Sequence, residues 1–383
     1  MDYQLNDDQR LLLRNIRDFA RKELMPLGDE LDESGRFPWE SIKKMAAIGL
    51  TALLIPERYE GMDVDAISYC LILEEMGYAN GPGSLVPGFS LASLPMILYG
   101  TEEQKSKYLP PMARGEKLTS FGLSEANAGS DNASMQSRAV RQGDVYVLNG
   151  SKCFNSFGSV AETYTVFAKT DPAAGHKGIT AFILEKGTPG FSFGAHEKKM
   201  GLGWVPTTDL AFDDCRVPLE NRLGEEGEGF KVAMSVLDPA RLTVAAFHTG
   251  LSQRAFDLAL EYAFQRVQFG RPIAQFQAIQ FKFADMALGI EAGRQLTYSA
   301  ARKKAAGQPY GREVSFAKLF TTENSNKVTY EALQIHGGYG YMKSYPMERL
   351  AREARLGTLG EGTSEIQRVI IADQIYREFK KRH

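Results

Sequence analysis

Cysteine and histidine are scarce in this chain. Its 383 residues include only three cysteines, Cys70, Cys153 and Cys215, and five scattered histidines. The cysteines are odd in number and widely spaced, and none belongs to a CxxC pair or a zinc-type Cys/His pattern. The sequence therefore predicts reduced thiols in a cytosol-like compartment, no metal site and, where a cofactor is needed, an organic one.

Strong net charge and long hydrophobic runs are also missing. A formal charge of -2 and a pI near 6.3 provide no basic field for a polyanion, so we expect no nucleic-acid partner. The N-terminus, residues 1–8, is acidic and lacks the apolar core of a signal or transit peptide. The apolar stretch 45–56 is too short to span a bilayer and contains Gly49. We therefore expect a cytoplasmic protein of bacterial type, without membrane insertion.

The chain is long enough for two or three packed subdomains. Residues 1–118 show helical periodicity, with Asn6 as a cap, Pro38 opening a helix, another helix at 65–76, and a capping-box pattern beginning at Thr101. The Gly-, Pro- and Ser-rich stretch 80–93 predicts an interrupting loop that could line a cleft. These features predict an all-helical N-terminal domain.

From residue 119 the period becomes strand-like. Short β-branched and aromatic runs at 145–147, 163–167, 179–184 and 210–212 are separated by turn signals at 142–144, Asn149-Gly150 and 186–187. Because no helices alternate with these strands, and no GxGxxG follows one, a Rossmann unit is not supported. Residues 119–228 are therefore predicted to form a β-barrel or sandwich domain.

Helical periodicity returns after Gly229 and continues to the end of the chain. Apolar stripes at 251–262 and 276–290, with further helices near 314–333 and 364–379, predict a four-helix bundle. The predicted fold is thus α+β and multi-domain: an all-α domain at 1–118, a β domain at 119–228 and a helical bundle at 229–383.

The C-terminal stretch 360–368 places a single carboxylate, Glu361, between two glycines and directly before an amphipathic helix. The glycines permit close backbone approach to a ligand, and Thr363 with Ser364 can cap a helix whose N-terminus favours an anion. A plain helix start has the same pattern, so this stretch gains weight only from the others.

Other stretches share this ligand-binding composition. Residues 121–131 combine small residues, hydroxyls and flexible backbone, and residues 152–156 offer Phe154 two positions from a hydroxyl. Residues 266–270 and 334–340 add a cation, amides and a Gly337-Gly338 pair. Ordinary loops and packed strands can contain each of these features alone.

Together these segments resemble the acyl-CoA dehydrogenase family over essentially the whole chain. The resemblance is carried by FGLSEANAGSD at 121–131, RVQFG at 266–270, QIHGGYGYM at 334–342 and EGTSEIQR at 361–368. It implies FAD bound between the β domain and the C-terminal bundle, and oxidation of an acyl-CoA thioester to its trans-2-enoyl form. It also implies a homotetramer, with an electron-transferring flavoprotein as the electron acceptor.

The resemblance further implies a role for individual residues. The flavin or acyl chain would contact Leu123, Ser124, Gly129 and Ser130, and the flavin ring would contact Phe154 and Ser156. Substrate would be bound by Ser130, Asp238, Arg241 and Gly362, with Asp238 and Arg241 facing the pantetheine. The FAD pyrophosphate and adenosine would be held across a subunit interface by Arg266, Phe269, Gln277, Gln334, Gly337 and Gly338, and the ADP half by Thr363 and Glu365.

Glu361 matches the family's catalytic base. The α-C–H beside a thioester is weakly acidic, so its removal needs a positioned carboxylate and stabilisation of the enolate oxygen. In the family a flavin ribityl hydroxyl and the backbone N–H of the base hold that oxygen. Some relatives place the base one residue before the arginine that corresponds to Arg241, but Ala240 stands there.

The chain departs from the family pattern at three places. Gly360 replaces a common tyrosine, Asn155 replaces an apolar residue beside the flavin, and 203–206 reads Gly-Trp-Val-Pro. The glycine predicts a wider pocket for a branched, cyclic or otherwise bulky acyl group, unless neighbouring side chains refill the space. Two other functions stay open at this point: a flavin oxidase or monooxygenase on the same fold, and a non-catalytic acyl-CoA-binding scaffold.

Overall fold

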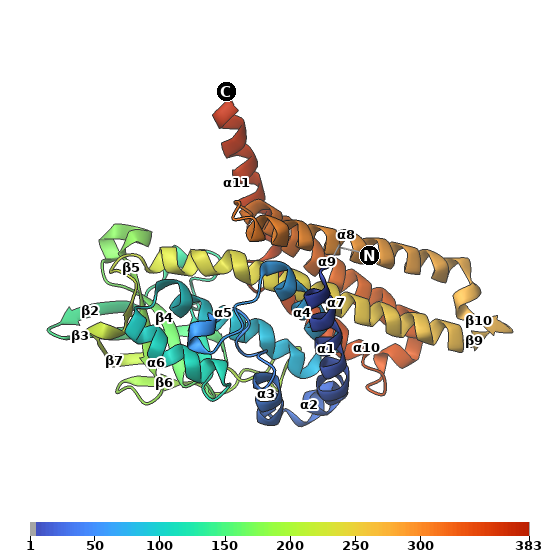
Figure 1. Ribbon diagram of the computed structural model, residues 1–383, viewed down its shortest axis with the longest axis horizontal. Coiled ribbons are helices and arrows are strands. Elements are labelled where there is room, and N and C mark those ends of the chain that lie inside the picture. The colour runs from blue at the N-terminus through green and yellow to red at the C-terminus, as the bar shows by residue number, and fades with distance from the viewer. Residues whose placement is uncertain (1–4, 383) are drawn as a thin grey trace.

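The computed structural model describes residues 5–382, so the first four residues of the acidic N-terminal stretch and His383 lie outside it. Helices at both ends of the chain flank a domain of strands (Figure 1), as the sequence predicts. The N-terminal helices are α1 Asp7–Phe19, α2 Gly28–Ser34, α3 Trp39–Ala46, α4 Ala66–Ala79, α5 Val86–Tyr99 and α6 Glu102–Ala113.

Side chains fix the start of several of these helices where the sequence predicts it. Asn6 and Gln9 form a capping box at α1, and Thr101 and Gln104 form another at α6. Asp65 accepts hydrogen bonds from the first turn of α4. These caps satisfy backbone N–H groups that have no partner inside their own helix.

The predicted loop at 80–93 is wrong. A 3-10 helix, Gly81–Leu85, leads directly into α5, because prolines are tolerated in the first turn of a helix, where backbone N–H groups are unpaired anyway. Within residues 5–382, Gly81–Tyr99 has the length and composition to cross a membrane, but 67% of its apolar window is buried inside the protein. The segment is therefore a core helix of the fold.

The middle of the chain forms one eight-stranded sheet within the described residues. Its strands are β1 Thr119–Gly122, β2 Arg138–Gln142, β3 Val145–Ser156, β4 Thr163–Lys169, β5 Ile179–Glu185, β6 Phe191–Phe193, β7 Thr207–Pro218 and β8 Arg222–Leu223. The order is β6-β7-β3-β2-β4-β5-β8, with β1 parallel to β4. β2 meets β4 through only one residue pair, Arg138 and Lys169. Tyr146 of β3 packs edge-on against Phe182 of β5 at 4.9 Å between ring centroids, so the two halves face each other as in a sandwich.

The predicted turn at Asn149-Gly150 is also wrong, because both residues lie inside β3. The register of β3 against β7 shifts there, and Gly150 has φ +138°. A Cβ on Gly150 would lie 2.7 Å from the Ser137 Cα, so the glycine permits a β-bulge and not a hairpin. β1, whose last two residues open the stretch 121–131, is a strand because its backbone pairs with β4.

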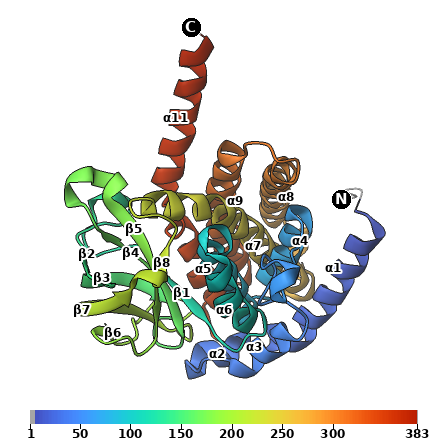
Figure 2. The same ribbon diagram turned by 60° about the vertical axis from the view of Figure 1, so that its left-hand side comes forward.

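The C-terminal part contains α7 Gly229–Gln265, α8 Gln277–Ala305, α9 Gly311–His336, α10 Met347–Ala354 and α11 Ser364–Arg382. A hairpin of β9 Val267–Gln268 and β10 Arg271–Pro272 joins α7 to α8 at the end of the molecule farthest from the sheet (Figure 1). α7, α8 and α9 pack along one another, and α4 joins them. α11 is joined to the first part of α9 by ion pairs and projects from the body in both views (Figures 1 and 2).

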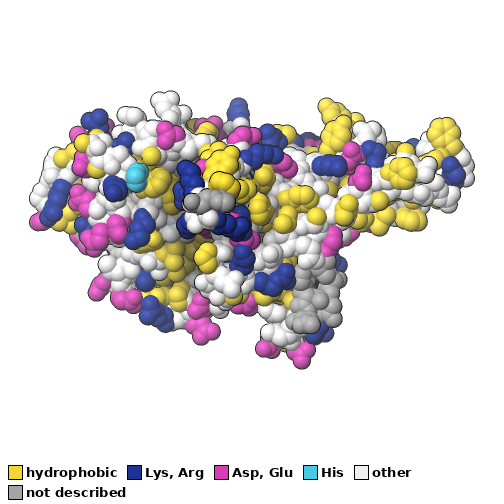
Figure 3. Space-filling model, turned by 90° about the horizontal axis from the view of Figure 1, so that it is seen from above, with side chains coloured by type: hydrophobic (Ala, Val, Ile, Leu, Met, Phe, Trp, Pro, Cys, Tyr) yellow, Lys and Arg dark blue, Asp and Glu magenta, His cyan; other side chains and the backbone are white. Residues whose placement is uncertain are grey.

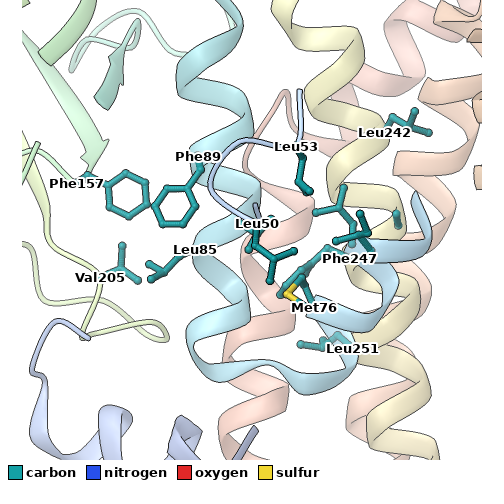
Figure 4. Close-up of a cluster of buried hydrophobic side chains, with 14 of the residues drawn as sticks. Leu50, Leu53, Met76, Leu85, Phe89, Phe157, Val205, Leu242, Phe247 and Leu251 are labelled. Atoms are coloured by element: carbon teal, nitrogen blue, oxygen red, sulfur yellow. The ribbon is translucent and has the colours of Figure 1, made fainter. Parts of the chain in front are cut away.

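A buried apolar cluster joins the helical parts to the sheet domain (Figure 4). Phe157, just after β3, stacks on Phe89 of α5 with ring centroids 5.6 Å apart. Leu85 and Val205 lie beside this pair, while Met76, Phe247 and Leu251 continue the cluster toward α4 and α7. The three parts therefore share one core, which fixes their relative positions.

Two glycines allow α4 and α7 to approach very closely. A Cβ on Gly77 would lie 1.9 Å from the Phe247 carbonyl oxygen, and one on Gly250 would lie 1.8 Å from the Glu74 carbonyl oxygen. Each obstacle is backbone, so no side-chain rotation can relieve it. The position of α7 relative to the N-terminal helices thus depends on main-chain contact.

We expect Gly250→Ala to destabilise the protein by about 3 kcal/mol, because the added methyl group forces the two helices apart. Chemical denaturation followed by circular dichroism measures the effect. Gly203→Ala is the control, since a Cβ there meets no atom within 4 Å. Equal unfolding midpoints for the two variants would contradict the proposed backbone contact.

Candidate active site

Glu361 lies on a left-handed turn between α10 and α11. Its φ is +55° and that of Gly362 is +87°. A positive φ is uncommon for a residue other than glycine and is tolerated where the surroundings hold the backbone in place. Thr363 then caps α11 by accepting a hydrogen bond from the Ile366 N–H at 3.3 Å, as the sequence predicts. The start of α11 thus follows a strained backbone that carries one carboxylate, Glu361.

Three side chains from three helices hold the backbone carbonyls of this turn. The Lys318 Nζ of α9 donates to the Gly362 oxygen at 2.6 Å. The Gln367 Nε2 of α11 donates to the Glu361 and Gly362 oxygens at 3.2 and 3.1 Å, and the Arg241 Nε of α7 donates to the Glu361 oxygen at 3.4 Å. We call Arg241, Lys318 and Gln367 the carbonyl clamp.

The protein around Glu361 alters its proton affinity. Burial raises the pKa of Glu361, and the opposing effects of Lys318 and Arg241 are smaller. Burial lowers the pKa of Lys318 to about 8, although the Glu361 carboxylate favours the ammonium. Burial and the nearby Lys318 charge lower the pKa of His248 to about 3. At neutral pH His248 is therefore uncharged, and Glu361 binds a proton more readily than an exposed glutamate.

The predicted substrate residues on α7 lie next to this turn. Arg241 is buried, and its Nη1 pairs with the Asp238 carboxylate at 2.7 Å. A Cβ on Gly311, at the start of α9, would lie 3.2 Å from that same carboxylate. The structure thus brings together Glu361, Gly362, Arg241 and Asp238, which lie far apart in the sequence.

Strand β3 presents an aromatic ring and a hydroxyl on an open face. Phe154 is 74% exposed although its ring is apolar, and its φ of +60° is strained. Ser156 is exposed beside it, whereas Lys152 and Asn155 are buried. An exposed aromatic side chain on a strained backbone fits a planar ring as its partner.

A buried ion pair joins this strand to the loop at 121–131. The Lys152 Nζ contacts the Glu125 Oε1 at 2.7 Å, and Glu125 also accepts hydrogen bonds from two backbone N–H groups. The Cys153 N–H donates to the Ser124 oxygen at 2.9 Å. Leu123 is buried under the loop, while Gly129 and Ser130 are exposed. Close to Phe154, the loop thus presents small, flexible and hydroxyl residues to solvent.

Another set of predicted cofactor residues lies at the end of the molecule that carries the β9–β10 hairpin (Figure 1), whereas Thr363 and Glu365 lie at the start of α11. A cavity of about 560 Å³ is lined by Tyr262, Arg266, Gln268, Ile273, Ile335, His336, Gly337, Gly338, Tyr339 and Met342. Phe269 is 94% exposed, and Gln277 and Gln334 are also exposed. A Cβ on Gly337 or Gly338 would meet no atom within 4 Å, so backbone lines an open surface. In this region Arg266 can contact a phosphate, and the aromatic side chains can stack on a ring.

Within one chain these two groups of residues do not meet. Arg241 and Arg266 lie at two ends of a stretch of α7, and a rise of 1.5 Å per residue puts them about 37 Å apart. The residues present fit FAD in type: the open face of β3 offers an aromatic ring and a hydroxyl for a flavin, and Arg266 offers a cation for its phosphates.

The departures from the family pattern have different surroundings. Asn155 turns away from the open face, and its Nδ2 donates to the Thr208 oxygen at 2.9 Å. Trp204 is buried in the core. The Cβ position of Gly360 has only the Leu356 oxygen within 4 Å, at 3.9 Å, so space remains beside Glu361.

Sequence reasoning missed Lys318, Gln367 and the Glu125–Lys152 pair. The available signal for Lys318 is a lysine on the buried stripe of α9, among Val314, Ala317, Thr321 and Thr322. A lysine there usually extends to solvent, so only the fold reveals the clamp. Within residues 5–382 no group of His, Cys, Asp and Glu could hold a metal ion.

Comparison with family models matches all three parts of the chain. The N-terminal domain of acyl-CoA dehydrogenase matches residues 6–116, the middle domain matches residues 120–215 and the C-terminal domain matches residues 227–376. A short-chain-specific acyl-CoA dehydrogenase of Clostridium acetobutylicum is 44% identical, covering 98% of this chain and 100% of its own. A 3-(aryl)acrylate reductase of Clostridium sporogenes is also 44% identical, covering 97% and 99%.

Solved structures match equally well. Butyryl-CoA dehydrogenase from Megasphaera elsdenii is 43% identical with a TM-score of 0.94, covering 98% of this chain and 100% of its own. A chain solved in work on the electron transferring flavoprotein of Acidaminococcus fermentans is 45% identical with a TM-score of 0.95, with the same coverage. The described chain thus belongs to the acyl-CoA dehydrogenase family and is an FAD-dependent oxidoreductase that dehydrogenates acyl-CoA thioesters.

Proposed function

We propose that Glu361 is the base that removes the α-proton of the acyl-CoA. The observation that carries this assignment is the carbonyl clamp, which holds one carboxylate on a strained turn beside Arg241. The raised pKa suits a base that must take a weakly acidic proton near neutral pH. Since only the carboxylate form accepts a proton, the rate rises with pH through that raised pKa.

The neighbouring groups have separate tasks in this proposal. The backbone N–H of Glu361 stabilises the enolate oxygen, and Arg241, Asp238, Gly362 and Ser130 position the thioester and its pantetheine. FAD held by these residues would supply the oxidant, and the hydride that leaves the β-carbon would pass to flavin N5. Phe154 and Ser156, with Leu123, Ser124 and Gly129, hold the ring and exclude water from it.

The assembly we propose is a cytoplasmic homotetramer that passes electrons to an electron-transferring flavoprotein. Arg266, Phe269 and Gln277, with Gln334, Gly337 and Gly338, would hold the pyrophosphate and adenosine of a neighbouring subunit's FAD, while Thr363 and Glu365 contact its ADP half. The separation of about 37 Å along α7 supports this arrangement. The similar chain solved in work on an electron transferring flavoprotein supports the acceptor.

Exposed apolar side chains lie where such subunits would meet. Hydrophobic residues are visible over α8 and toward the β9–β10 end (Figure 3), and the exposed ones are Phe264, Val267, Phe269, Phe281 and Leu288. On α11, Val369, Ile375 and Tyr376 are about half exposed or more. Contiguous surfaces of this kind commonly become buried in an oligomer.

For the substrate we propose an acyl group wider than a slim straight chain. The open space at Gly360 supports this, and exposed Leu356 and Leu359 flank it with apolar surface. The relative named for an aryl acrylate acts on a bulky group, whereas the relatives named for short-chain and butyryl substrates favour a small straight one. A panel of thioesters decides between them.

The base assignment predicts that Glu361→Gln slows flavin reduction on the order of 1000-fold while FAD stays bound, because the amide cannot take the proton. Anaerobic stopped-flow absorbance with excess acyl-CoA measures the rate. Glu378→Gln is the control, since Glu378 lies on α11, the helix that follows the turn, and pairs with Arg312 away from Glu361. A Glu361→Gln enzyme that bleaches at the wild-type rate would remove Glu361 from the mechanism.

The pocket assignment predicts that Gly360→Tyr lowers kcat/KM for branched, cyclic and aryl thioesters roughly tenfold to a hundredfold while butyryl-CoA is turned over as before. Gly360→Ala is the size control. The wild type should bleach with at least one bulky thioester. If its kcat/KM for butyryl- or octanoyl-CoA far exceeds that for every bulky thioester, the proposal is wrong.

The split site predicts that the FAD-bound protein is a tetramer and that Arg266→Ala lowers FAD affinity in every subunit, because each cofactor loses a cation contributed by its neighbour. Analytical ultracentrifugation gives the mass, and absorbance after dialysis gives the FAD content. A monomer that retains one FAD per chain would refute the shared site.

A further inference from the structure

Lys318 is a buried cation that the residues assigned above leave unexplained. Its side chain is fully buried on α9, and no salt bridge joins it to a carboxylate within residues 5–382. Its Nζ donates to a neutral acceptor, the Gly362 oxygen, at 2.6 Å. Burying an ammonium without an ion-pair partner is costly, so packing alone does not account for a lysine at this position.

We propose that Lys318 is a positioning residue for the base: its ammonium holds the Gly362 carbonyl and so keeps the Glu361–Gly362 turn in the shape that presents the Glu361 carboxylate. The inference rests on the proposed role of Glu361. Within the carbonyl clamp the Lys318 contact, at 2.6 Å, is shorter than those of Gln367 and Arg241.

The anchor of this contact is rigid. Lys318 stands on α9 beside the buried small residues Ala317 and Thr321, and α9 packs along both α7 and α8. Gln367, by contrast, belongs to α11, which directly follows the turn, so it does not anchor the turn to a separate element. Lys318 therefore ties the turn to a helix that is fixed independently of it.

Lys318 acts on Glu361 through its charge as well as through its hydrogen bond to the Gly362 oxygen. A cation near a carboxylate favours the ionised form, which is the form that accepts a proton. The other charged or titratable groups around these two residues come from α7, α9, α11 and the turn before it: Asp238, Arg241, His248, Glu323, Arg355, Glu365 and Arg368. Removing the lysine leaves Arg241 as the cation acting on the pKa of Glu361, so this pKa rises further.

The test compares Lys318→Met, which keeps the side-chain length without donor or charge, with the wild type and with Lys318→Arg. In Lys318→Met we expect the plateau rate of flavin reduction to fall roughly tenfold to a hundredfold and its acid limb to move up by roughly one pH unit. Lys318→Arg should restore part of both. Lys304→Met on α8, another lysine whose pKa burial lowers, is the control and should change neither.

Two readouts do not depend on turnover. Hydrogen–deuterium exchange of the backbone at 359–364 should become faster in Lys318→Met, and calorimetry should show weaker binding of a 3-thia-acyl-CoA, which cannot be dehydrogenated. The melting temperature should stay the same or rise, because methionine removes a buried charge. A purely structural lysine would instead lower the melting temperature and leave the plateau rate of the folded enzyme unchanged.

The outcomes separate this inference from the assignment of the base. If Glu361→Gln proves inactive but Lys318→Met retains the wild-type plateau, acid limb and exchange rate, Lys318 has no positioning role. If Lys318→Met fails to fold, Lys318→Arg becomes the test. A wild-type melting temperature with faster exchange at 359–364 and a lowered plateau rate supports positioning, whereas wild-type exchange, plateau rate and pH profile overturn it. If Glu361→Gln is fully active, exchange at 359–364 still reports whether Lys318 holds the turn.

Discussion

Glu361 stands on an irregular turn, so the backbone carbonyls of that turn have no hydrogen-bond partner within a helix or strand. Buried backbone oxygens need hydrogen-bond donors, and here the donors are side chains from α7, α9 and α11. The active-site turn thus depends on three helices being in the correct relative position. The glycine crossing of α4 and α7, the shared core in Figure 4 and the packing of α9 on α7 all serve that requirement.

The order of helical, strand and helical parts could be predicted because each has its own hydrophobic period, and caps such as Asn6 and Thr101 have local causes. Composition misled where tertiary context decided the structure. Residues 80–93 are rich in Gly, Pro and Ser yet form buried helix, and Asn149-Gly150 looks like a turn but accommodates a bulge against Ser137. β1 is short, and pairing with β4 makes it a strand.

The candidate site divides in the same way. Runs of suggestive residues predict Glu361, Phe154 and the Arg266 region, whereas the family resemblance alone predicts Arg241. The roles of Lys318 and Gln367 could not be predicted, although Gln367 lies within the EGTSEIQR run, because the partner of each is a backbone carbonyl that carries no sequence signal. The buried Glu125–Lys152 pair also could not be predicted from the sequence, because 26 residues lie between its members and only the position of β3 brings them together.

The main-chain contact between α4 and α7 also bears on how this scaffold accommodates change. Because carbonyl oxygens and glycine Cα atoms set the spacing at Gly77 and Gly250, side chains elsewhere can be exchanged without altering it. The space beside Gly360 can then be enlarged or filled while the helices that carry the clamp stay in register. The helices that position the catalytic turn and the residues beside Gly360 that would contact the acyl group are thus separate parts of one chain. Their sequences can diverge at different rates.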